Sequence, residues 1–278
     1  MLSYDFIALA CAADLTRTGL RVCSRGDAVF TKLDPMSVYL QPHRARECPV
    51  SYYWRGDAIR SRSVSDVVLC GMVDVSAPPA RLVADWQRET SLRISLEPGD
   101  VEALPLPRAR TRWPDYKHCV QAASDWTRTL GLQDVLAGSD VALMACRGAR
   151  YHHDGAQYGG SAFCNLFLSD DKGLDLHFAA TGCRIPIARG TVVIFDTGQP
   201  HAVIVRNSAG FSVADFPPER DCTQVFLTWE LPIENADIAQ ALGIAFDIDT
   251  ANASRLRDEQ VWLNGALTTV CPQSGRCI

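Results

Sequence analysis

A His-x-Asp sequence near the middle of the chain is the strongest indication of chemistry, and it lies within Tyr151–Gly155. In an extended backbone, residues two apart project to the same side, so His152 and Asp154 can bind one ion together. We expect the third ligand to be His201, which follows a turn and begins an apolar run. Two neutral imidazoles and one carboxylate leave positions open, as Fe(II) needs for a cosubstrate and dioxygen, whereas zinc prefers a closed tetrahedron.

Each of these residues also has a structural interpretation. A histidine considered alone is more often a hydrogen-bonded structural residue than a ligand, and it is the joint placement that favours a metal. Asp154 precedes Gly155 and could instead form a turn, although the histidine two residues before it favours the ligand role. His153 is out of phase with Asp154, and His177 lies inside an alternating strand, so both are poorer ligand candidates. We expect His177 in the core or next to the ligands.

The elements that must position these residues are short strands separated by turns rich in Gly, Asp, Asn and Ser. This pattern predicts a sandwich or jelly-roll barrel. The predicted strands are Val141–Cys146, Ala162–Leu168, Leu174–Phe178, Thr191–Phe195, Ala202–Val205 and Gln224–Trp229.

Helical patterns flank the strands and predict an α+β fold. The predicted helices are residues 5–18, Tyr116–Leu130, Asn235–Leu242 and Ala251–Leu263. We therefore expect three regions: an N-terminal α+β region over 1–140 that packs on the barrel, a catalytic core over 141–232, and a helical tail over 233–278. The order of strands and loops from 37 to 107 is not fixed by the pattern.

The stretch from Val141 to Leu231 resembles the double-stranded β-helix (jelly-roll) core of the Fe(II)/2-oxoglutarate-dependent dioxygenases. Besides the His-x-Asp sequence, the resemblance rests on Asn165-Leu166 leading to Leu168-Ser169, on Gly173–Phe178, on Ile185–Phe195, and on His201-Ala202-Val203. It implies Fe(II) bound by His152, Asp154 and His201, with 2-oxoglutarate and dioxygen as cosubstrates of a hydroxylation. The acidic charge balance favours a small molecule, such as an amino acid or related metabolite, as the substrate. Asp154 speaks against halogenation, because the halogenases of the family have a small residue there.

The anchor for the distal carboxylate of 2-oxoglutarate departs from the family's pattern, which places an arginine at the start of the last barrel strand. Here Gln224 occupies that place, while Arg206 and Arg220 lie five and nineteen residues after His201. An arginine suits a carboxylate because its fork donates two parallel hydrogen bonds. If the last strand begins early, Arg220 shares a face with Gln224, so we favour Arg220 over Arg206. Gln224 or Thr228 could add a hydrogen bond to the cosubstrate, and Asn165 could also donate to it or be a buried amide bonded to backbone.

Composition limits the partners. The 278 residues carry a formal charge of −5, with a pI near 5.7, so there is no basic footprint for nucleic acid, although arginines cluster at Arg60, Arg62 and 108–112. No run approaches the about 18 apolar residues of a membrane span. The eleven cysteines, including Cys271 and Cys277, have no regular spacing, so we expect reduced thiols and a cytoplasmic protein.

Two alternatives remain open from the sequence. One is a cupin-like jelly-roll metalloprotein with non-oxidative chemistry, which would work without 2-oxoglutarate. The other is a non-catalytic module that binds a ligand on the same fold and consumes no oxygen.

Overall fold

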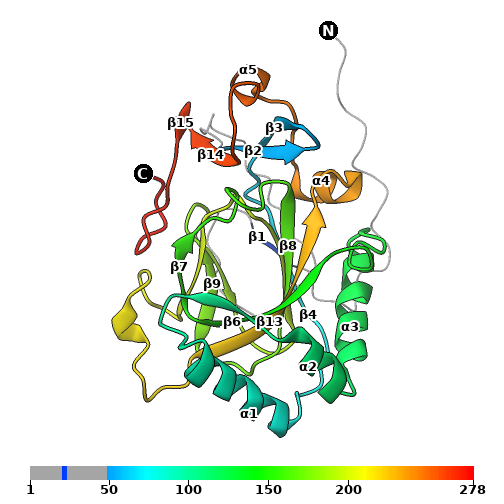
Figure 1. The fold of residues 1–278 in the computed structure, drawn as a ribbon, viewed down its shortest axis with the longest axis vertical. Helices are drawn as coiled ribbons and strands as arrows, with labels where there is room; N and C mark the ends of the chain where they lie inside the picture. Colours follow the sequence, from blue (N-terminus) through cyan, green and yellow to red (C-terminus); the bar gives the residue numbers. More distant parts are fainter. Residues whose placement is uncertain (1–20, 24–48) are drawn as a thin grey trace.

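A computed structural model describes residues 21–23 and 49–278 of the chain (Figure 1). The predicted helix over 5–18 lies outside these residues. The strands are β1 (Arg21–Cys23), β2 (Val50–Arg55), β3 (Ala58–Ser63), β4 (Val68–Met72), β5 (Val101–Leu104), β6 (Val141–Arg147), β7 (Ala149–His152), β8 (Ser161–Phe167), β9 (Leu174–Phe178), β10 (Cys183–Pro186), β11 (Thr191–Asp196), β12 (His201–Val205), β13 (Thr223–Pro232), β14 (Gln260–Leu263) and β15 (Ala266–Leu267). The helices are α1 (Ala80–Arg88), α2 (Leu106–Arg112), α3 (Tyr116–Thr129), α4 (Ala236–Leu242) and α5 (Thr250–Ala253), with a π-helical turn, η1 (Glu89–Arg93), and a 3-10 turn, η2 (Val213–Asp215).

Two antiparallel sheets form a double-stranded β-helix, the jelly-roll core of an α+β fold. The larger sheet has seven strands in the order β1-β4-β11-β8-β13-β6-β5, and the smaller has the order β10-β9-β12-β7. Non-consecutive strands are neighbours in both sheets, as expected when successive strands alternate between them. All six strands predicted between Val141 and Trp229 are confirmed: Leu174–Phe178 has the predicted bounds, and each of the others has at least one end shifted by one to three residues.

Side chains alternate along β13, so one strand contacts the helical layer on one face and the space between the two sheets on the other. Val225, Leu227 and Trp229 face outward and join a core cluster with Trp113 and Trp126 from the helical layer. Helices α1 to α3 therefore cover the outer face of the larger sheet, where burial of apolar area stabilises their packing. The intervening residues of β13 face the space between the two sheets.

Strands outside the predicted core extend these sheets. β4 and β5 come before residue 141, yet β4 pairs with β11 and β5 pairs with β6. The division of the chain at residues 140 and 232 stays a prediction.

The helices beside the core were predicted with mixed success. The helices predicted at Tyr116–Leu130 and Asn235–Leu242 are confirmed as α3 and α4, and the side chain of Asn235 caps α4 by accepting from two backbone N–H groups. The helix predicted over Ala251–Leu263 is wrong, because only α5 is helical there.

The last four residues of that predicted helix form strand β14 of a third sheet, ordered β15-β14-β2-β3. Val261 lies opposite Ser51 of β2, about two hundred residues earlier in the chain. Pairing with β2 satisfies the backbone of this segment, which outweighs its weak local helical pattern. The third sheet lies beyond one end of the barrel (Figure 1).

Within the described ranges, the structure contains no helix that is both long and apolar enough to cross a bilayer.

Candidate metal centre

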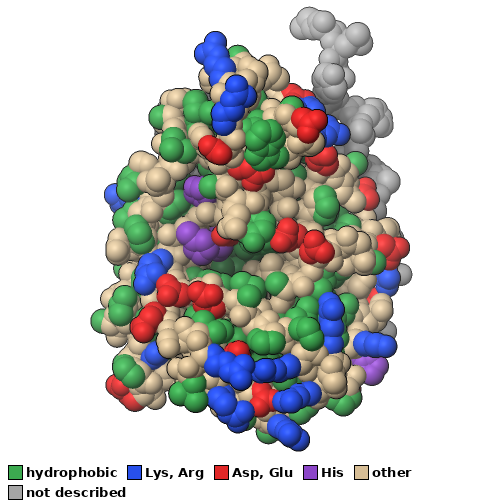
Figure 2. Space-filling model, in the orientation of Figure 1, with side chains coloured by type: hydrophobic (Ala, Val, Ile, Leu, Met, Phe, Trp, Pro, Cys, Tyr) green, Lys and Arg blue, Asp and Glu red, His purple; other side chains and the backbone are tan. Residues whose placement is uncertain are grey.

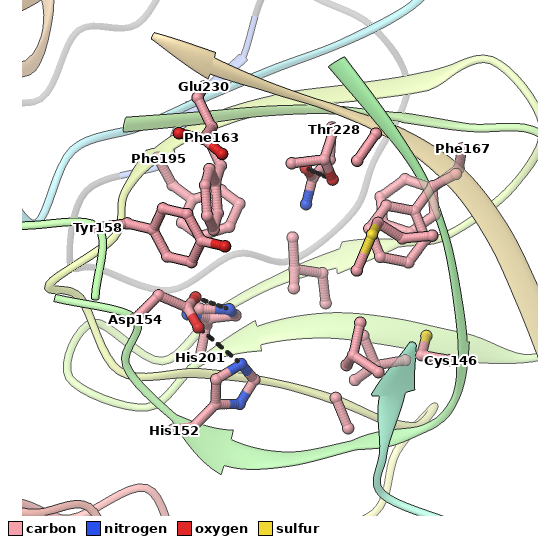
Figure 3. A pocket seen from close by; sticks show the side chains of 18 of the residues that line it. Cys146, His152, Asp154, Tyr158, Phe163, Phe167, Phe195, His201, Thr228 and Glu230 are labelled. Atoms are coloured by element: carbon pink, nitrogen blue, oxygen red, sulfur yellow. Dashed lines mark hydrogen bonds and ion pairs between the residues drawn. The ribbon is translucent and has the colours of Figure 1, made fainter. Parts of the chain in front are cut away.

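Three predicted ligands meet at one end of the barrel. His152 is the last residue of β7 and His201 is the first of β12, and the antiparallel register of these strands places the two residues opposite each other. Asp154 lies in the turn after β7, with one carboxylate oxygen 3.6 Å from Nε2 of His152 and the other 3.6 Å from Nε2 of His201. One ligand atom from each residue lies within 4.8 Å of the others (Figure 3).

These separations suit a shared ion. Two donors about 2.1 Å from one ion lie about 3 Å apart at a right angle and about 3.6 Å apart at 120°. Among the described residues, this is the one group of three or more His, Cys, Asp or Glu side chains that could hold a metal ion.

Backbone carbonyls orient both imidazoles. Nδ1 of His152 lies 2.7 Å from the carbonyl oxygen of Arg150, and Nδ1 of His201 lies 2.9 Å from that of Gln199. A carbonyl oxygen can only accept, so Nδ1 is the donor in each ring, and in the neutral form the lone pair is on Nε2, where it can serve a metal. Both Nε2 atoms face Asp154, so the two tautomers are the ones a metal requires.

Burial reinforces the neutral form of His201. Burial, followed by the neighbouring His152, lowers the pKa of His201 to about 4, although Asp154 acts in the opposite direction. At neutral pH His201 is therefore available as a ligand without first losing a proton.

The loops that carry Asp154 and His201 are joined directly. The backbone N–H of Asp154 donates to the carbonyl oxygen of Thr197 at 2.8 Å. A Cβ added at Gly155 would come within 3.1 Å of the Cα of Gly198 and 2.6 Å of a Val261 methyl, so the glycine permits this close approach. The φ of Gly155 is not positive, so the Asp-Gly pair is not explained by a left-handed turn.

A buried ion pair also holds these loops. The guanidinium of Arg62 donates to both carboxylate oxygens of Asp196 at 2.6 and 2.8 Å, and its Nε donates to the carbonyl of Gly159 at 2.7 Å. Both side chains are completely buried. Asp196 also accepts from the backbone N–H groups of Gly198 and Ser65, so this pair links strand β3 to the turn that leads into His201.

His152, Asp154 and His201, called the metal-ligand group below, line one end of a cavity of about 370 Å³ between the two sheets. In Figure 2 a hollow lies between histidine side chains on one side and acidic side chains on the other. Its inner wall is formed by cross-strand pairs of β13 and β8: Phe226 opposite Phe167, Thr228 opposite Asn165, and Glu230 opposite Phe163. The cavity is large enough for a small organic molecule.

The four residues predicted to bind 2-oxoglutarate do not all reach the cavity. Asn165 is buried in the cavity wall, and its Oδ1 accepts from the Thr228 hydroxyl at 2.7 Å. Gln224 shares the inward face of β13 but is not a lining residue; its Nε2 donates to the carbonyl of Asp170 at 3.3 Å.

Neither arginine reaches the cavity wall. Arg206 is bound to the carboxylates of Asp171 and Asp175. β13 begins at Thr223, after Arg220 rather than before it, and the exposed Arg220 donates to the carbonyl of Lys172 at 2.9 Å. Of the four predicted residues, the structure brings only Asn165 to the cavity.

The sequence interpretation missed Glu230, Asp140 and Tyr158 of the cavity wall, and the pairing of Arg62 with Asp196. Glu230 could have been found by following the two-residue period from Gln224 along the same strand. The Arg62 pairing joins residues 134 apart and leaves no local signal.

Comparison with known proteins gave no match to any family model and none to a curated protein. Among solved structures, the non-heme alpha ketoglutarate dependent epimerase SnoN from nogalamycin biosynthesis is similar over 73% of this chain and 92% of its own, with 14% identity and a TM-score of 0.30. Vicilin from Corylus avellana (hazelnut) is similar over 82% and 70%, with 8% identity and a TM-score of 0.24. Scores this low do not establish a common fold, so the fold rests on the sheets described above.

Proposed function

We propose that this chain is a non-haem Fe(II)-dependent oxygenase that uses 2-oxoglutarate to hydroxylate a small molecule. The observation that supports it most is the convergence of His152, Asp154 and His201 on one point at the wall of the cavity between the two sheets. Two neutral imidazoles and one carboxylate on one side leave the cavity side open for cosubstrate, which is the donor set of the non-haem iron oxygenases. The resemblance of residues 141–231 to that family supports the same proposal.

Iron bound by these residues would supply the activation of dioxygen. The protein's own part is to fix the donors and to exclude water. The carbonyls of Arg150 and Gln199 hold the imidazoles, and the rings of Phe195 and His201, with centroids 4.7 Å apart, pack together at the buried side of the site. Such packing keeps the donor geometry rigid, because neither ring can rotate without losing its contact.

Within this proposal, Asn165 and Thr228 are the residues placed to contact 2-oxoglutarate. The Thr228 hydroxyl donates to Oδ1 of Asn165, so the group that Asn165 can present to a ligand is its amide N–H. These donors are neutral. Among the described residues, no lysine or arginine lines the cavity, so a distal carboxylate would meet hydrogen-bond donors there rather than a guanidinium.

That feature favours a second candidate: a jelly-roll metalloenzyme that works on the same metal site without 2-oxoglutarate. A dicarboxylate that enters a partly buried cavity without a cationic partner loses solvation that neutral donors only partly replace. The acidic residues Asp140 and Glu230 in the same wall make an anionic ligand less favourable still.

One experiment separates these functions. Protein reconstituted anaerobically with Fe(II) is supplied with 2-oxoglutarate and dioxygen over a panel of small molecules, and succinate is measured beside metal content. We expect one Fe(II) per chain and succinate formation, with both lost in His152→Ala, Asp154→Ala and His201→Ala. His118→Ala, at an exposed site on α3, is the matched control and should retain both.

Metal binding without succinate would favour the second candidate. Unchanged metal content and turnover in the three triad variants would rule out this site altogether.

A further inference from the structure

The charged residues that line the cavity all carry the same sign. They are Asp140, Asp154 and Glu230, and no described lysine or arginine joins them. Asp154 faces the two histidines and belongs to the metal-ligand group. Two carboxylates, those of Asp140 and Glu230, are left without a role in the proposed metal site.

Glu230 lies at the same end of the cavity as the metal-ligand group. On β13 it lies directly opposite Phe163 of β8. Phe163 contacts Phe195 with ring centroids 6.1 Å apart, and Phe195 contacts His201 at 4.7 Å. A continuous aromatic surface therefore runs from the metal-ligand group to the carboxylate, and Figure 3 shows Glu230 beside Phe163 at that end.

Asp140 and Glu230 are adjacent and lack a cationic partner among the described residues. The backbone N–H of Glu230 donates to the carbonyl of Asp140 at 3.0 Å, which keeps the two residues together. Neither carboxylate forms an ion pair with a described residue, whereas the more buried Asp196 and Asp175 are each paired with arginine. Burial, followed by the charge of Asp140, raises the pKa of Glu230, so a cation bound beside this carboxylate would stabilise its charged form.

The rings beside Glu230 also suit a cation. Tyr158 and Phe163 line the cavity with centroids 5.2 Å apart in an edge-to-face arrangement. An aromatic face attracts an ammonium group that lies within about 6 Å of its centroid. A carboxylate beside aromatic faces in an apolar cavity is a combination that binds an organic amine better than its neutral or anionic analogues.

We propose that the substrate of this site is a small organic cation, with a protonated amine held by Glu230 and Asp140 against Tyr158 and Phe163, and an apolar body that lies along Phe195 toward the metal. The inference rests on the proposed function in naming this ligand a substrate. Recognition of the amine itself depends only on the cavity wall. Glu230 is accordingly a specificity-determining residue.

The test is direct binding by calorimetry, without turnover, on metal-free protein and on protein loaded with Mn(II). The probes are benzylamine, tryptamine and hexylamine, each compared with the alcohol and the carboxylate of the same carbon skeleton. We expect at least one amine to bind about tenfold or more tightly than its alcohol, with the carboxylate weakest. Glu230→Gln should reduce that preference to about twofold or less, and Asp140→Asn, at an exposed site, should reduce it in part.

Glu219→Gln is the matched control, because it makes the same chemical change at an exposed position that does not line the cavity. The inference is overturned if no amine binds, if an alcohol or carboxylate binds as tightly as its amine, or if both cavity variants keep the full preference. Succinate formation without amine preference would leave the proposed function standing and refute this inference. A preference for amines without succinate formation would support this inference and count against the proposed function.

Discussion

The buried pair of Arg62 and Asp196 gives the sharpest test of how the metal-ligand loops are held. In Arg62→Met the side chain keeps much of its length but loses the guanidinium, which leaves the carboxylate of Asp196 buried without a cation. Removing one partner of a buried ion pair costs about 3–5 kcal/mol. Asp196 still accepts from two backbone N–H groups, so we expect the lower end, about 3 kcal/mol.

Thermal unfolding measures this change. For a chain of this size, about 3 kcal/mol corresponds to a fall in Tm of about 6–12 °C. The affinity for Mn(II) should also fall by about tenfold or more, because the turn from Asp196 carries the Gln199 carbonyl that orients His201. Arg62→Lys should recover part of both, since a single ammonium cannot replace two parallel donors.

The matched control is Arg60→Met, on the same strand. Arg60 pairs with Asp247 at the protein surface, where both side chains are substantially exposed, so Tm and metal affinity should barely change. A second check is Arg62→Met combined with Asp196→Asn, which removes the unpaired charge and should be less destabilised than Arg62→Met alone. If Arg62→Met behaves like Arg60→Met, or if the double variant loses the sum of the two single effects, the role assigned to this pair is refuted.

Three further predictions concern residues outside the metal-ligand group. Arg206→Ala and Arg220→Ala should leave the KM for 2-oxoglutarate within about twofold of the parent, because neither lines the cavity; a rise of about 10²-fold in either would restore that arginine as the anchor. Burial, followed by the charge of Arg184, lowers the pKa of His177 to about 4 from an ordinary 6.5. The unfolded chain therefore binds this proton at a higher pH than the folded chain, and stability should fall as pH is lowered from about 6.5 to about 4. His177→Phe should reduce the slope of Tm against pH in that range, and an unchanged slope would contradict this prediction. Replacing Cys271 and Cys277 with Ser should leave turnover and Tm unchanged with or without mild reductant, and a native disulfide seen by mass spectrometry would disprove this.

The metal-ligand group could be predicted from sequence because short-range spacing and turn residues identify its members. His152 and Asp154 are two residues apart, and His201 follows a turn with strong Gly and Pro signals. The barrel strands could also be predicted, because each is a short apolar run bounded by turns rich in Gly, Asp, Asn and Ser.

The helix predicted over Ala251–Leu263 failed for the opposite reason. That segment has a weak local pattern, and strand β14 forms within it because its edge pairs with β2 from the far end of the chain. No local propensity encodes a partner about two hundred residues away.

The sequence alone predicts the strand pattern of the barrel, the type and spacing of the metal donors, and the absence of an arginine at the usual place in the last strand. The fold was needed to locate Arg206 and Arg220, to show that Arg62 pairs with Asp196 next to the ligand loops, and to place Glu230 beside Phe163 in the cavity wall. The physical reason is that side-chain alternation is fixed by each strand alone. Which charges meet across a cavity depends on the register between strands, and that register is set by the packing of the whole barrel.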